Sequence, residues 1–175
     1  MSAATARFSE SGISGSAVLD ISTPQYKAAE WVSDIDGLLL PVDTAQFLQR
    51  YLLATFYFAL SGDKWTQCGR TDSNCVEGPW LTGSECSWFG ITCDSSSSVI
   101  RIAPGPAGNG LAGQIPSEVR LLTNLALFSV ASNRINGTFP DFLGSLPKLS
   151  NLNLIKNGLT GTIPADFFRR ATALK

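Results

Sequence analysis

The 175-residue sequence contains no histidine. Histidine is the commonest general base near neutral pH and a frequent metal ligand, so its absence removes most nucleophilic triads and most metal sites. Charged residues make up only 15% of the chain, the net charge is −1, and Lys and Arg form no run. Because a nucleic-acid-binding surface needs clustered positive charge, we expect no nucleic-acid partner. The composition favours a binding or structural module over an enzyme.

The chain also lacks a long hydrophobic segment. Its longest uncharged apolar run, residues 51–62, has 12 residues, whereas a membrane-spanning helix needs about 20. The Ser- and Ala-rich start has no basic region followed by an apolar one, so no signal peptide is visible. We expect residues 1–20 to form a flexible lead-in, and any membrane attachment to come through a segment not present in this chain.

The four cysteines fall in two pairs, each with six residues between its members. Neither pair has CxxC spacing, and without histidine a zinc site would need all four thiolates. We therefore expect two local disulfides, Cys68–Cys75 and Cys86–Cys93, rather than a metal site or four reduced thiols. Disulfides indicate an oxidising compartment. We expect no metal and no cofactor.

Two helices are expected before the cysteines. Thr23 followed by Pro24 is typical of a helix start, and that helix should reach about Val32. Asp43 or Thr44 can cap a second, stronger helix that continues to about Leu60, because apolar residues recur along it every four positions. The aromatic residues of this stripe are expected in the core.

One phrase occurs three times near the end of the chain, with Asn, Gly and Pro at fixed offsets and a period of 24 residues. A period of this length with aliphatic residues at fixed positions is typical of a stacked solenoid. The three copies are Asn109-Gly-Leu-Ala-Gly-Gln-Ile-Pro116, Asn133-Arg-Ile-Asn-Gly-Thr-Phe-Pro140 and Asn157-Gly-Leu-Thr-Gly-Thr-Ile-Pro164.

The segment before these repeats carries a more specific signature. It reads Cys86-Ser-Trp-Phe-Gly-Ile-Thr-Cys93 and directly precedes the aliphatic repeats. This pattern resembles the N-terminal cap of plant-type extracellular leucine-rich-repeat proteins, and the repeats resemble the consensus of the same class. The stretch from Pro24 to Phe58 is similar to the leader of diatom leucine-rich-repeat proteins.

The resemblance implies an α/β repeat fold, namely a leucine-rich-repeat solenoid with a short parallel β-sheet on its concave face. A helical, disulfide-bonded cap would occupy residues 21–98. The repeats would occupy residues 99–175, divided at about 99–124, 125–148 and 149–175. The first copy fits only with two extra residues within Pro104–Gly108, so we expect a bulge there. The third copy loses the pattern after Arg169, so we expect a truncated array.

The repeat register separates structural residues from candidate binding residues. Asn109, Asn133 and Asn157 should form an internal ladder, because an amide side chain can donate and accept hydrogen bonds at once. Outward strand positions are not needed for the core and should line a concave ligand-binding face. These positions are Leu127, Ser129, Ala131, Ser132, Asn151, Asn153, Ile155 and Lys156. Asn136-Gly-Thr138 is a glycosylation sequon at an outward position.

The expected function is recognition without catalysis, with no catalytic residues. The resemblance to receptor-like kinase ectodomains implies an extracellular or cell-surface module that binds a protein, peptide or glycan, although the chain has no kinase motifs of its own. A free-standing secreted inhibitor, similar to polygalacturonase inhibitors, is one alternative. A structural or adhesive surface solenoid is another, but a flat ice-contacting array would need more threonines than Thr138, Thr160 and Thr162.

Overall fold

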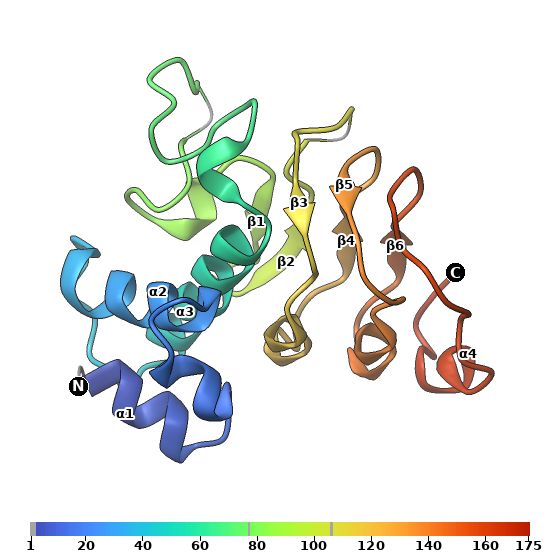
Figure 1. The fold of residues 1–175 in the computed structure, drawn as a ribbon, viewed down its shortest axis with the longest axis horizontal. Helices are drawn as coiled ribbons and strands as arrows, with labels where there is room; N and C mark the ends of the chain where they lie inside the picture. The colour runs from blue at the N-terminus through green and yellow to red at the C-terminus, as the bar shows by residue number, and fades with distance from the viewer. Residues whose placement is uncertain (1–2, 77, 106) are drawn as a thin grey trace.

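The computed structural model describes residues 3–76, 78–105 and 107–175, and it has a helical cap followed by coils that carry two sheets (Figure 1). The helices of the cap lie at one end of the molecule and the coils follow one another to the other end. The cap contains α1 (Ala3–Glu10), η1 (Gly15–Leu19), α2 (Pro24–Glu30), η2 (Trp31–Ile35), α3 (Ala45–Ala59), η3 (Gly62–Lys64), η4 (Glu85–Ser87) and β1 (Ile91–Cys93). The coils contain β2 (Val99–Ile102), β3 (Ala112–Gly113), η5 (Ser117–Leu121), β4 (Leu127–Ser129), β5 (Arg134–Ile135), η6 (Asp141–Ser145), β6 (Asn151–Asn153) and α4 (Phe167–Arg170).

Both expected helices of the cap form, and each begins with a threonine cap. The Thr23 hydroxyl accepts a hydrogen bond from the Tyr26 backbone N–H before α2, and the Thr44 hydroxyl accepts one from the Phe47 N–H before α3. These bonds satisfy donors that the first turn of a helix leaves free. Helix α2 runs directly into η2, a π-helical turn, and α3 is buried along most of its length.

The expectation of a flexible lead-in is wrong for residues 3–20. Helix α1 and η1 pack on the cap, and Phe8 and Val18 are fully buried. The Phe8 ring stacks on the Tyr51 ring of α3 with centroids 3.7 Å apart. Composition misled here because one large aromatic side chain, rather than an apolar stripe, anchors the segment.

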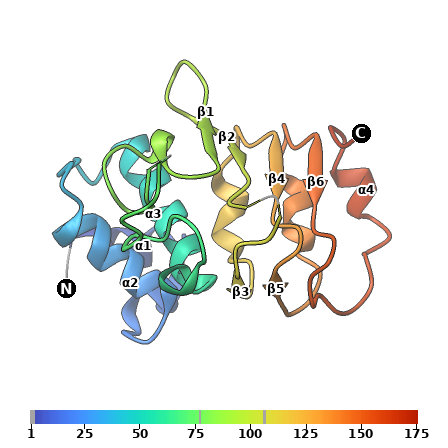
Figure 2. The same ribbon diagram turned by 90° about the horizontal axis from the view of Figure 1, so that it is seen from above.

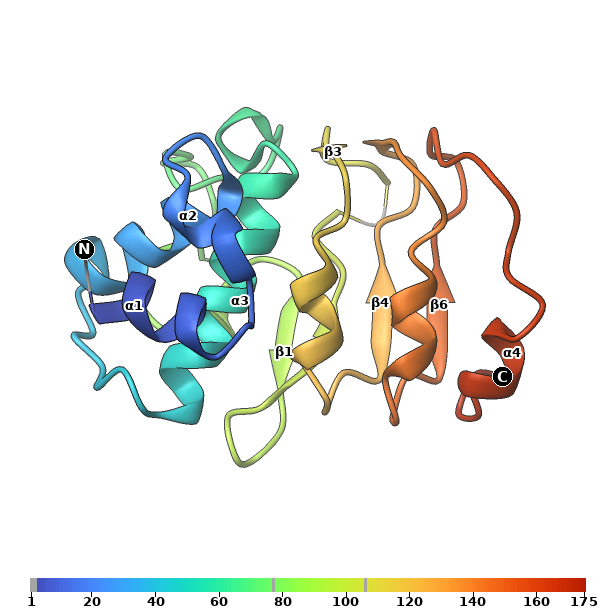
Figure 3. The same cartoon turned by 60° about the horizontal axis from the view of Figure 1, so that its bottom comes forward.

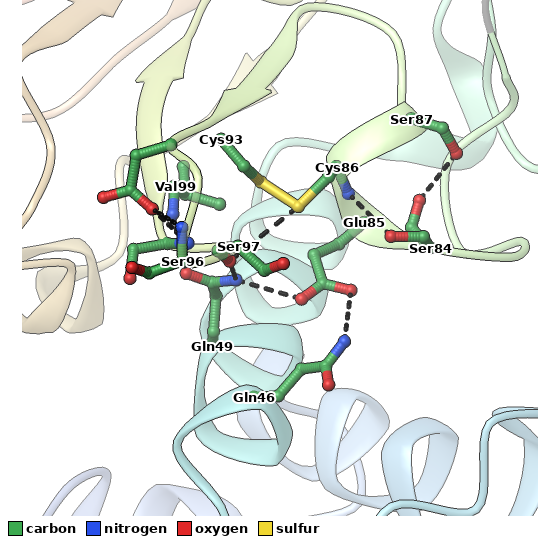
Figure 4. The surroundings of a disulfide bond; sticks show 12 residues. Gln46, Gln49, Ser84, Glu85, Cys86, Ser87, Cys93, Ser96, Ser97 and Val99 are labelled. Atoms are coloured by element: carbon green, nitrogen blue, oxygen red, sulfur yellow. Dashed lines mark hydrogen bonds between the residues drawn. A yellow bond between two sulfur atoms is a disulfide. The ribbon is translucent and has the colours of Figure 1, made fainter.

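The cysteine-rich segment is bonded as the spacing predicted. Cys68 is joined to Cys75, and Cys86 to Cys93. The second disulfide lies beside the first half of α3, where the Gln49 amide donates to the Glu85 carboxylate and to the Ser97 carbonyl, both at 2.9 Å (Figure 4). The loop that the disulfide closes is therefore also held against α3 by hydrogen bonds.

A buried ion cluster that the sequence did not predict lies at the centre of the cap. The Arg50 guanidinium is fully buried and donates to Asp36 at 2.5 and 2.7 Å and to Glu85 at 2.7 Å. It also lies over the rings of Trp31 and Trp88, 5.2 and 5.1 Å from their centroids. Excellent geometry of this kind is what allows a charge to be buried at all.

The coils are joined to the cap through one sheet of order β1-β2-β4-β6 (Figure 2). Strand β1 is antiparallel to β2, and the other neighbours are parallel. Leu127 pairs with Asn151, and the two residues are one period of 24 apart in the sequence. Arg101 pairs with Leu127, and these two residues are 26 apart (127 − 101), which is two more than one period. The two extra residues of the first coil are therefore real. The expected bulge, Pro104–Gly108, includes Pro106, which lies outside the described residues; Gly105 and Gly108 both have positive φ.

The repeated asparagines link each coil to the one before it. The Asn133 side-chain oxygen accepts from the backbone N–H groups of Asn109 and Leu111 at 2.9 and 3.0 Å, and the Asn157 oxygen accepts from the Ile135 N–H at 3.0 Å. Asn109, the first member, instead bonds the cap, where its oxygen accepts from the Gln67 N–H at 2.6 Å. These asparagine side chains bond backbone groups and not one another, and each bond joins two successive coils.

Candidate functional site

The candidate site is the outward face of the four-stranded sheet. In β4 the side chain of Phe128 is fully buried, whereas Leu127 and Ser129 on either side of it are partly exposed, as strand alternation requires. In β6, Asn151 is exposed and Asn153 is partly exposed. We name this surface the strand face and define it by Thr92, Arg101, Leu127, Ser129, Asn151 and Asn153.

The register places four of these residues in one row across the sheet. Thr92 pairs with Arg101, Arg101 with Leu127, and Leu127 with Asn151. Sequence reasoning missed Thr92 and Arg101, although both are exposed. The signal was present, because alignment of the first coil with two extra residues places Arg101 opposite Leu127.

The chemistry of the strand face suits recognition. Arg101 makes no salt bridge within the part of the chain that the structure describes. Its guanidinium is therefore available to a carboxylate, the amides of Asn151 and Asn153 can donate and accept, and Leu127 offers apolar area. Among residues 3–76, 78–105 and 107–175, no three His, Cys, Asp or Glu side chains are arranged to hold a metal ion.

The residues that follow the strands behave differently from those within them. Ala131 was expected on the concave face, but it is only 5% exposed, so this expectation is wrong. Strand alternation ends at Ser129, and the inward-outward parity cannot be extended to Ala131. Ser132 and Lys156 occupy left-handed turns with φ of 59° and 55°. Ile155 and Lys156 are exposed beside the strand face, and their role in binding stays a prediction.

The sequon directly follows a strand of the other, two-stranded sheet. Asn136 follows β5, and the side chains of Asn136 and Thr138 are both exposed. Gly137 between them has a φ of 86°, in the left-handed region that favours glycine. Glycosylation of Asn136 stays a prediction.

Comparison with known proteins gives relatives of one kind, although no family model matches the chain. The chain is 34% identical to leucine-rich repeat extensin-like protein 4 of Arabidopsis thaliana over 108 residues, which cover 59% of this chain and 22% of that protein. It is 30% identical to the receptor-like kinase TMK2 of the same plant over 135 residues, which cover 73% of this chain and 15% of the kinase. The chain therefore spans less than a quarter of the length of these relatives.

Solved structures give the same fold. The Arabidopsis receptor kinase HAESA, in complex with the peptide hormone IDA and the co-receptor SERK1, matches with a TM-score of 0.52 and 27% identity over 71% of this chain and 20% of that chain. A plant ice-binding protein matches with a TM-score of 0.54 and 26% identity over 70% of this chain and 36% of that chain.

These comparisons, the parallel sheet and the two disulfides define a solenoid protein with a capped end. The chain is a leucine-rich-repeat protein of the plant extracellular type. The number of its repeats stays a prediction. None of the helices in the described ranges is long and apolar enough to cross a membrane.

Proposed function

We propose that this chain is a non-catalytic recognition module of a secreted or cell-surface protein, and that it binds a protein or peptide through the strand face. The observation that carries the proposal is one row of paired residues across the sheet. Their side chains lie on the same side of the sheet and outside the core; the residues are Thr92, Arg101, Leu127 and Asn151. The complex of HAESA with a peptide hormone supports a peptide as the ligand class.

The charge on the strand face narrows the ligand. Arg101 brings the one charge in this row, so the bound segment should carry a carboxylate opposite it. Leu127 next to it and Asn151 beyond it favour an apolar side chain followed by a polar group. The two disulfides support an extracellular location, where such ligands would be met.

A random displayed peptide library panned on the unmodified protein tests the proposal. We expect the recovered peptides to be enriched in Asp and Glu, and the variant Arg101→Glu to bind them at least ~10-fold more weakly, because like charges would then face each other. The matched control is Arg120→Glu, an exposed arginine on η5 with the same charge change. Peptides that bind Arg101→Glu and Leu127→Asp as well as the wild type would sink the proposal.

The other functions differ in how they use this surface. A free-standing inhibitor would recognise its target through the same face, so the experiment tests recognition and leaves attachment open. The likeness to an ice-binding protein supports the fold, but Thr138 and Thr160 form only an isolated bridge outside the named strands. We do not propose ice binding for so short a threonine array.

A further inference from the structure

A cavity lies between the cap and the coils, away from the strand face. It has a volume of about 480 Å³, within the range of roughly 300–1,000 Å³ that is typical of ligand pockets. Its walls come from the start of α2, from η5 and from η6, and none of the residues that line it belongs to the strand face. Figure 3 shows η5 in yellow between the blue helices of the cap and η6 in orange.

Glu118, in the first turn of η5, is the buried charge of this cavity. Its side chain is only 3% exposed. One carboxylate oxygen, Oε1, accepts hydrogen bonds from the Ser14 hydroxyl at 2.8 Å and from the Gln25 amide at 3.0 Å. The other oxygen, Oε2, is buried and has no hydrogen-bond partner among the described residues.

A comparison with Glu85 shows what Glu118 lacks. Both carboxylates are almost completely buried. Glu85 accepts a hydrogen bond from the Arg50 guanidinium at 2.7 Å, whereas Glu118 forms no salt bridge within the described ranges. Each unpaired oxygen of a buried carboxylate is costly, and Oε2 of Glu118 is an acceptor that the described residues leave unused.

The neighbours of Glu118 hold it in place but cannot supply that charge. The Tyr51 hydroxyl lies 2.6 Å from the Ser14 hydroxyl, which in turn donates to Oε1 of Glu118. Burial raises the pKa of Tyr51 to about 12, and the Glu118 carboxylate adds to the rise. This chain of neutral hydroxyls orients the carboxylate, and Glu118 is among the residues that line the cavity.

The remaining walls favour a planar cation. Asp141 provides a second carboxylate, Phe139 and Phe142 provide aromatic surface, and none of the described residues that line the cavity is Lys or Arg. A guanidinium group stacks on aromatic faces and bonds carboxylates with several donors, whereas an ammonium group is more strongly hydrated. Asp141 is half exposed and pairs with Arg170 at 3.3 Å, so this wall already meets an arginine at its outer side.

We infer that this cavity is a second binding site, which takes the guanidinium group of an arginine side chain from a peptide segment and places it on Oε2 of Glu118. The site is independent of the strand face. Asn136 also lines the cavity, so a sugar attached there would stand at its margin.

Calorimetric titration of the unglycosylated protein with acetyl-Gly-Gly-Arg-Gly-Gly-amide tests the inference. The same peptide with citrulline in place of arginine is the neutral isostere. We expect arginine to bind at least ~10-fold more tightly than citrulline, and Glu118→Gln to remove that preference, because a charge-assisted bond would be lost. Glu10→Gln, an exposed glutamate of α1, is the matched control and should bind like the wild type.

Three results would overturn the inference. These are absence of binding by the arginine peptide, equal binding of the citrulline peptide, and an unchanged preference in Glu118→Gln. If free N-acetylarginine amide bound with equal affinity, the inference that the guanidinium group comes from a peptide segment would be overturned. Should Glu118→Gln unfold, Ser117→Trp provides the second variant, because Ser117 is exposed at the cavity and should block it without changing the Glu118 bonds. The variant Arg101→Glu should still bind the arginine peptide. A failure of the cavity proposal can therefore be distinguished from a failure of the strand-face proposal.

Discussion

The cap and the coils bury polar groups in different ways. In the cap, Arg50 meets Asp36 and Glu85, which lie 14 and 35 positions away along the chain. In the coils, Asn133 meets backbone groups 24 and 22 positions away, and Asn157 repeats one of these bonds. The cap thus depends on one cluster of charges that occurs once, whereas the coils use a neutral group again and again.

The difference predicts how each region responds to damage. Removing one member of a charged cluster leaves the others buried and unpaired, and the cost is large. Removing one asparagine strands a few neutral backbone groups, and the cost is smaller because neutral groups are less expensive to bury without partners.

The largest effect is expected for Arg50→Met. Methionine keeps much of the length of the side chain but leaves Asp36 and Glu85 without their cation, so the free energy of unfolding should fall by about 3–5 kcal/mol. Denaturant unfolding followed by tryptophan fluorescence measures this change. Arg70→Met is the control, because Arg70 pairs with Asp63 at the surface and exposed pairs contribute only about 0–1 kcal/mol. A loss for Arg50→Met no larger than that for Arg70→Met would contradict the charged-cluster account of the cap.

The second prediction concerns the contact between the two regions. Gly113 has a φ of 128°, and a Cβ added there would lie 2.2 Å from the Ala59 carbonyl oxygen at the end of α3. Gly113→Ala should cost roughly 3 kcal/mol, from backbone strain and from the close contact together. Gly161 is the equivalent residue two periods later, has a φ of 81°, and has nothing within 4 Å. Gly161→Ala should therefore cost only about 1–2 kcal/mol of strain, and equal losses in thermal unfolding would show that the contact with α3 is unimportant.

The coils were more predictable from the sequence than the cap. The period of 24 gave the ladder of asparagines and the outward positions of β4 and β6, because each coil repeats the same environment. The cap at Thr23 and the disulfides were also visible, and Thr44 was one of two candidates for the second cap, since each feature depends on residues close together in the chain. Ala131 was misplaced because strand alternation does not extend past the last paired residue.

The rest depended on contacts between distant and non-repeating segments. Nothing near Arg50 in the sequence identifies Asp36 and Glu85 as its partners, and nothing near Phe8 points to Tyr51. The strand-face residue Arg101 was missed because two extra residues shift its register. The cavity at Glu118 draws its walls from the cap and from two coils, so no single motif could reveal it.

The third prediction tests one rung of the ladder. Asn133→Leu removes the acceptor for the Asn109 and Leu111 N–H groups and the donors to the Val130 and Ala131 carbonyls. The free energy of unfolding should fall by about 1–3 kcal/mol. Asn151→Leu makes the same substitution at an exposed position of β6, where a change within about 0.5 kcal/mol is expected. A loss shared equally by both variants would mean that the buried hydrogen bonds of Asn133 do not support the coils.

The smallest effect is expected for Glu118→Gln, and it compares the two regions most directly because Glu118 stands where they meet. The substitution keeps an oxygen to accept from Ser14 and Gln25, and it removes a charge that has no counter-charge among the described residues. The free energy of unfolding should therefore stay within about 1 kcal/mol of the wild type or rise. Glu85→Gln is the matched variant, equally buried but bonded to Arg50, and should cost about 2 kcal/mol or more. Equal losses in parallel denaturant titrations would mean that the fold itself satisfies the Glu118 charge, and the cavity would then have no need of a cation.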